Sequence, residues 1–188
     1  MYDAVFMIII FGDDSLGKTT FIKKILMKPF GSGCLETIGV EFYSKSVFVD
    51  GKKIKLAVLE LNGQMRFSFA FSNYVKAATG GLFLYDVTNR SSIARIEEWL
   101  SIIKKGLKEG DKWPILAVGI VNGDKSKRQI SAEEGKEIAK SRNLNGFIEC
   151  NLKTGKNVEK AFEDLIRLML PKDFFTHSCK KSHEKISS

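Results

Sequence analysis

Eight residues near the N-terminus have the types and spacing of a site that binds nucleotide phosphates. They match the G-x-x-x-x-G-K-[ST] motif at every specified position: Gly12-Asp13-Asp14-Ser15-Leu16-Gly17-Lys18-Thr19. In this motif backbone N–H groups converge on the phosphates, the lysine neutralises the β- and γ-oxygens, and the threonine hydroxyl ligates Mg²⁺. Thr19 is therefore a predicted metal ligand, and the predicted phosphate-binding residues are Asp14, Ser15, Leu16, Gly17, Lys18, Thr19 and Thr20.

The segments on either side of this loop have the patterns of a strand and a helix. Residues 4–11 are a nearly unbroken apolar run, typical of a buried parallel strand. Residues 20–28 contain neither Gly nor Pro and place Phe21, Ile25 and Leu26 at helical spacing. Strand, glycine loop and helix are the context that the motif requires, so a turn that merely resembles the motif is the disfavoured alternative.

Farther along the chain, strand and helix patterns alternate. Residues 41–49 and 53–60 are joined by Asp50-Gly51, which indicates a hairpin and one reversed edge strand. Strand and helix patterns then follow in turn at 81–85, 92–105, 115–121, 131–142, 147–150 and 157–170. This alternation predicts an α/β domain with a six-stranded, mostly parallel sheet, one antiparallel edge strand, and helices on both faces.

The composition limits the class of protein. At 188 residues with 44% apolar residues, the chain suits one domain with a full core. No stretch approaches the ~20 apolar residues of a membrane span, and the first residues lack the basic start of a signal peptide, so we expect a cytoplasmic protein. The scattered cysteines Cys34, Cys150 and Cys179 lack metal-ligand spacing and are expected to be reduced thiols.

The charge pattern favours a solvated surface. The net charge is +8, but the lysines are spread along the chain, so we expect no nucleic-acid partner. Periodicity ends after Pro171, which predicts a domain over 1–171 and a flexible basic tail over 172–188. The chain ends without a C-a-a-X box or paired cysteines. We expect a monomer without a stable lipid anchor and with at most weak electrostatic membrane contact.

Several separated segments, in the right order, resemble the Ras superfamily of small GTPases, and most of all its Rab branch, over about residues 3–170. Residues 36–42 resemble the Rab switch I segment, 84–89 its fourth strand, and 153–158 the stretch after its last base-binding loop. The resemblance implies a GTPase G domain that binds GTP or GDP with Mg²⁺. It also implies that Thr37 ligates Mg²⁺ and that Phe30 lies edge-on to the base, with an ordinary loop residue and a core residue as the respective alternatives.

The switch II segment departs from the family pattern. The family's D-x-x-G-Q-E is here Glu60-Leu61-Asn62-Gly63-Gln64-Met65. Glu60 keeps a carboxylate that could hold a water molecule on Mg²⁺, one methylene farther out. The resemblance implies that the Gly63 N–H meets the γ-phosphate and that Gln64, the expected catalytic residue, orients the attacking water.

The base-binding segments depart further. The family's N-K-x-D aligns with Ile120-Val121-Asn122-Gly123, which lacks both the Asn and the guanine-reading Asp. In a shifted register Asn122 and Asp124 could replace them, because Gly123 accepts backbone angles that other residues do not; the alternative is a plain polar turn. The family's S-A-K corresponds to Asn151, Leu152 and Lys153, where a backbone N–H contacts the base and the lysine covers it.

These features favour a Rab-like GTP/GDP switch, read by effector and regulatory proteins through the switch regions. Slow intrinsic hydrolysis is expected, because Asp14 falls where small residues of the family leave room for the γ-phosphate. The partner surface resembles the Rab aromatic triad in part, with Phe42 and Tyr74 present but Leu59 in place of Trp. The alternatives are a non-catalytic pseudo-GTPase scaffold, a nucleotide-binding protein of relaxed specificity, and a phosphotransferase or ATPase.

Overall fold

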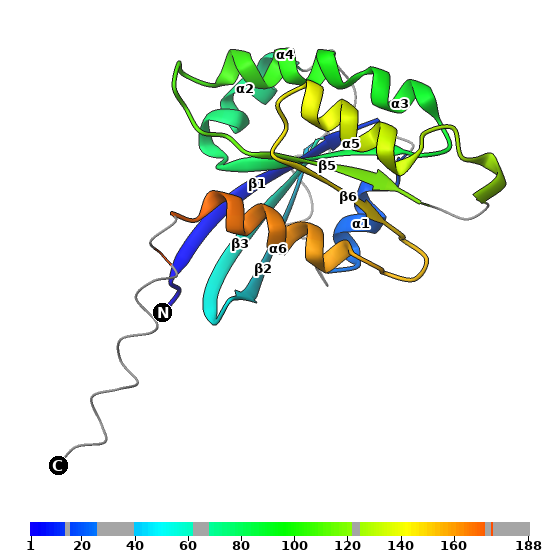
Figure 1. The fold of residues 1–188 in the computed structure, drawn as a ribbon. Helices are drawn as coiled ribbons and strands as arrows, with labels where there is room; N and C mark the ends of the chain where they lie inside the picture. The colour runs from blue at the N-terminus through cyan, green and yellow to red at the C-terminus, as the bar shows by residue number, and fades with distance from the viewer. Residues whose placement is uncertain (14–15, 26–39, 62–67, 122–124, 172–173, 175–188) are drawn as a thin grey trace.

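The computed structural model describes residues 1–13, 16–25, 40–61, 68–121, 125–171 and 174. Within them a six-stranded sheet has helices packed on both faces (Figure 1). In chain order the elements are β1 (Ala4–Gly12), α1 (Lys18–Lys23), β2 (Val40–Val49), β3 (Lys52–Leu61), α2 (Ser68–Ala77), β4 (Gly80–Asp86), α3 (Arg90–Ala94), α4 (Ile96–Gly106), β5 (Ile115–Ile120), the 3-10 helix η4 (Lys125–Lys127), α5 (Ala132–Ser141), β6 (Gly146–Cys150) and α6 (Val158–Met169).

The sheet topology confirms the predicted α/β architecture. The strand order is β2-β3-β1-β4-β5-β6, with β2 antiparallel to β3 at one edge and every other neighbouring pair parallel. A tight turn reverses the chain between β2 and β3. Asp50 and Gly51 both have positive φ there, 49° and 77°, which is the geometry that an Asp-Gly pair supplies in a two-residue hairpin loop.

Alternate residues of the central strand β1 pack into two separate hydrophobic cores, one on each face of the sheet. Ile8 and Ile10 belong to the cluster under α1 and α6, whereas Ile9 and Phe11 belong to the cluster under α2, α3 and α4. Figure 1 shows α1 and α6 on one side of the sheet and α2, α3, α4 and α5 on the other. The unbroken apolar run of β1 is thus explained by burial on both faces.

Three helical segments differ from the sequence-based expectation. The helix predicted over 92–105 is interrupted at Arg95, whose ψ of 1° leaves the helical range and separates α3 from α4. Helix α2 lies between the hairpin and β4, in a stretch for which the sequence patterns predicted no helix or strand. The helix predicted over 20–28 is α1 and ends at Lys23, followed by two described turn residues; its last three positions lie outside the described residues.

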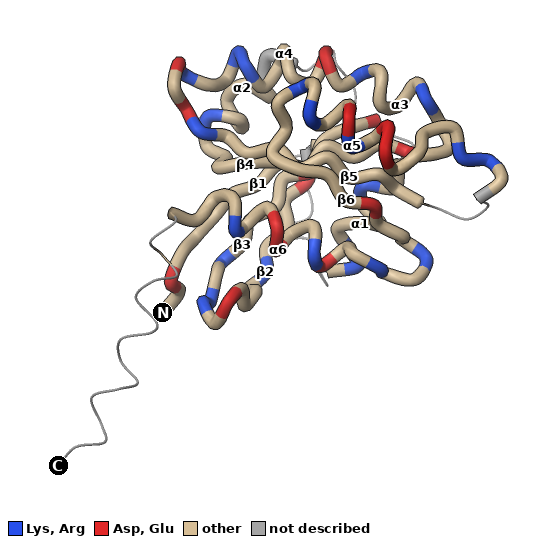
Figure 2. The backbone as a smooth tube through the Cα atoms, viewed as in Figure 1, with Lys and Arg blue, Asp and Glu red and all other residues tan. Residues whose placement is uncertain are grey.

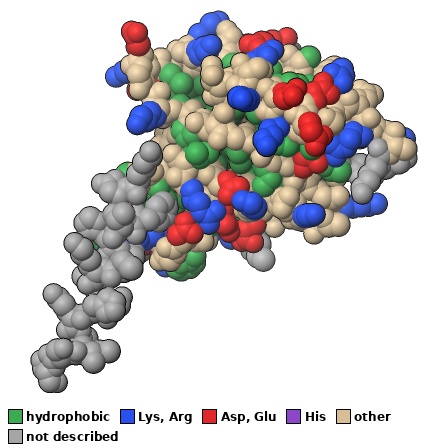
Figure 3. All heavy atoms as spheres, in the orientation of Figure 1, with side chains coloured by type: hydrophobic (Ala, Val, Ile, Leu, Met, Phe, Trp, Pro, Cys, Tyr) green, Lys and Arg blue, Asp and Glu red, His purple; other side chains and the backbone are tan. Residues whose placement is uncertain are grey.

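The predicted tail lies almost wholly outside the described residues. Its one described residue, Phe174, packs against the α1/α6 core cluster, and the Lys52 ammonium lies 5.4 Å from its ring centroid. Acidic and basic residues are interspersed along the backbone tube (Figure 2), and their side chains are interspersed over the face seen in Figure 3. None of the helices in the described part of the chain is long and apolar enough to cross a membrane.

Candidate functional site

The candidate site is built at the carboxyl ends of the parallel strands. The motif loop follows β1, Glu60 lies near the end of the adjacent strand β3, and the loop of residues 151–157 follows β6. In open α/β sheets this is the edge at which ligands bind. The sheet order therefore brings together chemistry that is widely separated in the sequence.

Lys18 is held inside the motif loop. Its side chain is only 2% exposed, and its Nζ donates to the carbonyl oxygens of Gly12, at 3.0 Å, and Asp13, at 2.7 Å. Gly17, just before α1, has φ 71° and ψ 35°, a left-handed conformation that glycine adopts without strain. The loop thus holds a buried ammonium group beside a helix N-terminus, which is the arrangement that binds phosphate.

Gly12 lets the loop begin directly against the neighbouring strand. A Cβ at this position would lie 2.2 Å from the carbonyl oxygen of Leu84 on β4, and the φ of Gly12 is 137°. Any side chain would push the loop away from β4 and strain the backbone. The packing against β4 therefore requires a glycine at the first position of the motif.

Thr19, on α1, forms a hydrogen bond with Glu60, on β3. The Thr19 Oγ1 donates to Glu60 Oε1 at 2.7 Å, and Glu60 is 1% exposed. Burial raises the pKa of the Glu60 carboxyl, which the hydrogen bond from Thr19 opposes. The longer glutamate side chain thus reaches the predicted metal-binding hydroxyl directly.

This donor set fits Mg²⁺. A hydroxyl oxygen and a carboxylate are hard ligands, and Mg²⁺ is commonly held by one or two carboxylates together with the phosphates of a nucleotide. In the described part of the chain there is no cluster of three or more His, Cys, Asp or Glu that could hold a metal alone. The pair of Thr19 and Glu60 therefore suits an ion that arrives with a nucleotide.

Tyr43 is a neighbour of Glu60 that the sequence did not reveal. It lies on β2, is 1% exposed, and its Oη donates to a Glu41 carboxylate oxygen and lies 3.2 Å from Glu60 Oε2. Burial, followed by the hydrogen bond to Glu41, raises the pKa of Tyr43 far above its usual range. The phenol is therefore protonated at neutral pH and serves as a donor.

Arg95 connects the motif loop to the helices on the neighbouring face of the sheet through ion pairs. Its Nη1 lies 2.6 Å from Asp13 Oδ1, and its Nε lies 3.2 Å from Glu98 Oε2. This is also the residue at which the predicted helix is interrupted. Asp13 and Arg95 are 82 residues apart, so no local pattern could have linked them.

The loop after β6 is a compact turn that contacts the motif loop. Asn151 Oδ1 accepts from the Thr154 N–H at 2.9 Å, and the Gly155 N–H donates to the Asn151 carbonyl at 2.8 Å. Leu152 is 6% exposed, and its Cδ1 lies 3.4 Å from where a Cβ on Gly17 would be. The turn therefore sets Leu152 beside the phosphate loop.

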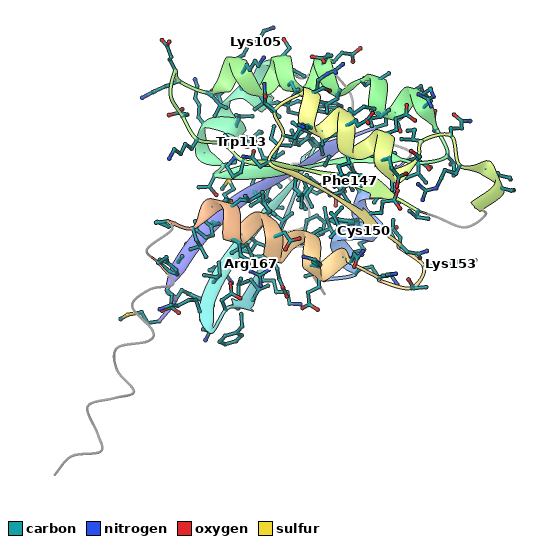
Figure 4. All side chains as sticks on the ribbon, viewed as in Figure 1. Lys105, Trp113, Phe147, Cys150, Lys153 and Arg167 are labelled. Atoms are coloured by element: carbon teal, nitrogen blue, oxygen red, sulfur yellow. The ribbon has the colours of Figure 1, made fainter. Side chains whose placement is uncertain are left out.

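Two further features border the base-binding segments. Lys153 is exposed on the loop between β6 and α6 (Figure 4). Arg128, just after η4, makes a bidentate ion pair with Glu149 on β6, at 2.7 and 3.0 Å. That pair fixes the segment that follows residues 122–124 to the end of the sheet.

The aromatic residues near α2 divide between core and edge. Phe71 is fully buried and lies 6.3 Å, ring to ring, from Trp99, and Leu59 is also fully buried. Phe42 and Tyr74 are partly buried, with their ring centroids 5.9 Å apart in an edge-to-face arrangement. Among the side chains of this group that the structure describes, Phe42 and Tyr74 are the ones left partly exposed.

The structure describes part of the predicted residue set. It brings together Leu16, Gly17, Lys18, Thr19, Thr20, Glu60 and Leu152 at one edge of the sheet, with Asn151 and Lys153 in the adjoining turn. The other predicted residues lie outside the described ranges: Asp14, Ser15, Phe30, Thr37, Gly63, Gln64, Asn122 and Asp124.

Comparisons with known proteins found a matching family model and several relatives of similar sequence. The Ras family model matches residues 7–171. Ras-related protein Rab-13 of Canis lupus familiaris is 33% identical over 171 residues, which are 91% of this chain and 83% of that protein. Ras-related protein Rab-8B of Homo sapiens is 33% identical over 91% of this chain and 81% of that protein. Ras-related protein Rab-11B of Dictyostelium discoideum is 32% identical over 89% of this chain and 75% of that protein.

Proposed function

Since this chain belongs to the Ras family, in its Rab branch, and is a GTP-binding molecular switch, we propose that its nucleotide site is formed by Lys18, Thr19 and Glu60 together with the loop after β6. Proteins of this family bind GTP or GDP with Mg²⁺. The observation that carries the proposal is the hydrogen bond between Thr19 and Glu60 beside the buried Lys18 ammonium.

Each of these residues has a distinct role in the proposal. Lys18 places its positive charge where the β- and γ-phosphates lie, and its bonds to the Gly12 and Asp13 carbonyls keep it there when phosphates leave. The Thr19 oxygen would ligate Mg²⁺ while its hydrogen is donated to Glu60. Mg²⁺ held there would supply positive charge that stabilises the phosphate oxygens. Leu152 presents its backbone N–H to the base.

The switch itself is proposed to involve segments that flank described elements. Thr37 precedes β2, while Gly63 and Gln64 lie between β3 and α2. Contacts of Thr37 and Gly63 with the γ-phosphate would order both segments, and hydrolysis promoted by Gln64 would release them. Effector and regulatory proteins would sense the difference beside Phe42 and Tyr74.

Native mass spectrometry of the purified protein tests this function. We expect GDP or GTP, with Mg²⁺, bound to the folded chain, because the buried Lys18 and the Thr19–Glu60 pair suit a magnesium nucleotide. An empty site would support the scaffold alternative instead. Bound adenine nucleotide would support a phosphotransferase or ATPase.

Slow intrinsic hydrolysis is a separate prediction, which depends on Asp14. A carboxylate ~4 Å from a phosphate charge costs about 4 kcal/mol at an effective dielectric constant near 20, and Lys18 with Mg²⁺ offsets part of this. Relief of even a third of that amount corresponds to about tenfold in rate. Asp14→Gly should therefore raise the single-turnover rate of GTP hydrolysis about tenfold.

A matched control is Glu109→Gly, which removes an acid from the exposed turn between α4 and β5. This variant should hydrolyse GTP at the rate of the unaltered protein. If Asp14→Gly also leaves the rate unchanged, Asp14 points to solvent and does not limit hydrolysis.

A further inference from the structure

We propose that Tyr43 is a positioning residue for the magnesium site, and that its hydroxyl holds the Glu60 carboxylate in the orientation that the metal requires. The inference rests on the proposed function, because it assigns a part to a residue beside the site of Thr19 and Glu60. Neither the motif nor the family resemblance assigns Tyr43 any role.

The geometry gives Glu60 a hydroxyl neighbour on each oxygen. Thr19 donates to Oε1 at 2.7 Å, and the Tyr43 Oη lies 3.2 Å from Oε2. Both Tyr43 and Glu60 are 1% exposed, so water does not compete for these contacts. Each carboxylate oxygen thus has one hydroxyl contact, and together the two contacts restrict the orientation of the carboxylate.

The need for this support follows from the glutamate itself. Glu60 has one more methylene, and therefore one more rotatable bond, than the aspartate that the family pattern has at this position. A buried carboxylate that lacks hydrogen-bond partners is strongly disfavoured. A longer side chain also has more rotamers, so its metal-binding oxygen could occupy more positions. Tyr43 restricts these positions through a rigid ring that rotates about only two bonds.

The strand register places Tyr43 where it can act. Glu41 on β2 is directly opposite Glu60 on β3, and Tyr43 is opposite Val58, one side-chain position away on the same face. Two like charges directly opposite each other in a sheet are destabilising. The Tyr43 hydroxyl contacts both carboxylates, and its single hydrogen is shared between a Glu41 oxygen, the nearer partner, and Glu60 Oε2, which offsets part of their repulsion.

The same contacts connect the metal site to the edge strand. Tyr43 and Glu41 both belong to β2, which begins directly after residues 36–39 of the switch I segment. Glu60 belongs to β3, directly before the switch II segment. Through the Tyr43 hydroxyl, the carboxylate on the metal side therefore depends on the position of β2.

The test is the Mg²⁺ dependence of nucleotide release from Tyr43→Phe. The protein is loaded with a fluorescent GDP analogue, and its release rate is measured over a range of free Mg²⁺ concentrations and in excess chelator. Phenylalanine keeps the buried ring but removes the hydroxyl. We expect the Mg²⁺ concentration that half-maximally slows release to rise about tenfold, since loss of such supporting groups typically costs 10–100-fold in metal affinity. Release in chelator should be unchanged.

Tyr85→Phe is the matched control. Tyr85 is fully buried on β4, and its Oη has no hydrogen-bond partner among the residues that the structure describes. This variant also removes a hydroxyl from a buried tyrosine in the sheet, and its Mg²⁺ midpoint should stay within about twofold of the unaltered protein.

Three results would contradict the inference in distinguishable ways. A Tyr43→Phe midpoint within twofold of the unaltered protein would show that the hydroxyl does not support the metal site. An equal rise in both variants, or faster release of Tyr43→Phe in chelator, would point to a general loss of packing. If the rate of nucleotide release from the unaltered protein does not depend on Mg²⁺, the proposed metal site is wrong, and so is the role proposed for Tyr43.

Discussion

Lys18→Ala should abolish measurable binding of GTP and GDP. The lysine is 2% exposed and lies over the loop carbonyls of Gly12 and Asp13, so it is the buried cation that the phosphates would meet. Two opposite unit charges ~4 Å apart attract by about 4 kcal/mol at an effective dielectric constant near 20, which is about a thousandfold in affinity. Titration of a fluorescent GDP analogue in the presence of Mg²⁺ measures the loss.

Lys23→Ala is the matched control for this variant. Lys23 ends the same helix, α1, but its side chain is exposed. Its replacement removes one positive charge from the same element and should change affinity by less than about twofold, because solvent screens exposed charges. Undiminished affinity in Lys18→Ala would remove the phosphate-loop interpretation, and an equal loss in both variants would reduce it to a net-charge effect.

The site should select guanine nucleotides less strongly than a site with an intact N-K-x-D segment. The guanine selectivity that remains should depend on Asp124. An aspartate that accepts hydrogen bonds from guanine N1 and N2 contributes ~1.5–3 kcal/mol for each bond, so its loss costs a hundredfold or more. We expect ATP and XTP to displace GTP at less than about a hundredfold excess. Asp124→Ala should further reduce the difference in binding affinity between GTP and ATP.

Competition binding of GTP, ATP and XTP, before and after Asp124→Ala, measures both effects. Glu137→Ala is a suitable control, since Glu137 is an exposed acid on α5. A strong preference for GTP that persists in Asp124→Ala would disprove the shifted register. The backbone N–H of Leu152, in the turn that packs against Gly17, would then be the main reader of the base.

Local sequence was sufficient to predict the phosphate loop and the strands around it. The motif residues from Gly12 to Thr19 are contiguous, and their flanking strand and helix follow from apolar patterns over a few residues. The hairpin between β2 and β3 was equally predictable, because Asp50-Gly51 accepts the positive φ angles of a tight turn. Each of these features is set by residues close together in the chain.

Periodicity alone could not locate the end of α3. Ile93, Ile96 and Trp99 keep helical spacing across the interruption at Arg95, and all three are buried in one cluster. The apolar pattern is therefore the same for one helix or for two. The ion pair of Arg95 with Asp13 joins residues 82 positions apart, so this contact exists only once α4 is packed over β1.

The tertiary structure alone decided how the metal side of the site is supported. Thr19 and Glu60 are 41 residues apart and meet because β3 lies beside β1 in the sheet. Tyr43 reaches Glu60 because the antiparallel register sets Glu41 opposite Glu60 and Tyr43 on the same face. A slip of one residue in that register would turn the Tyr43 side chain to the other face. The sequence determined which groups could bind phosphate, and long-range strand pairing determined which side chains hold those groups in position.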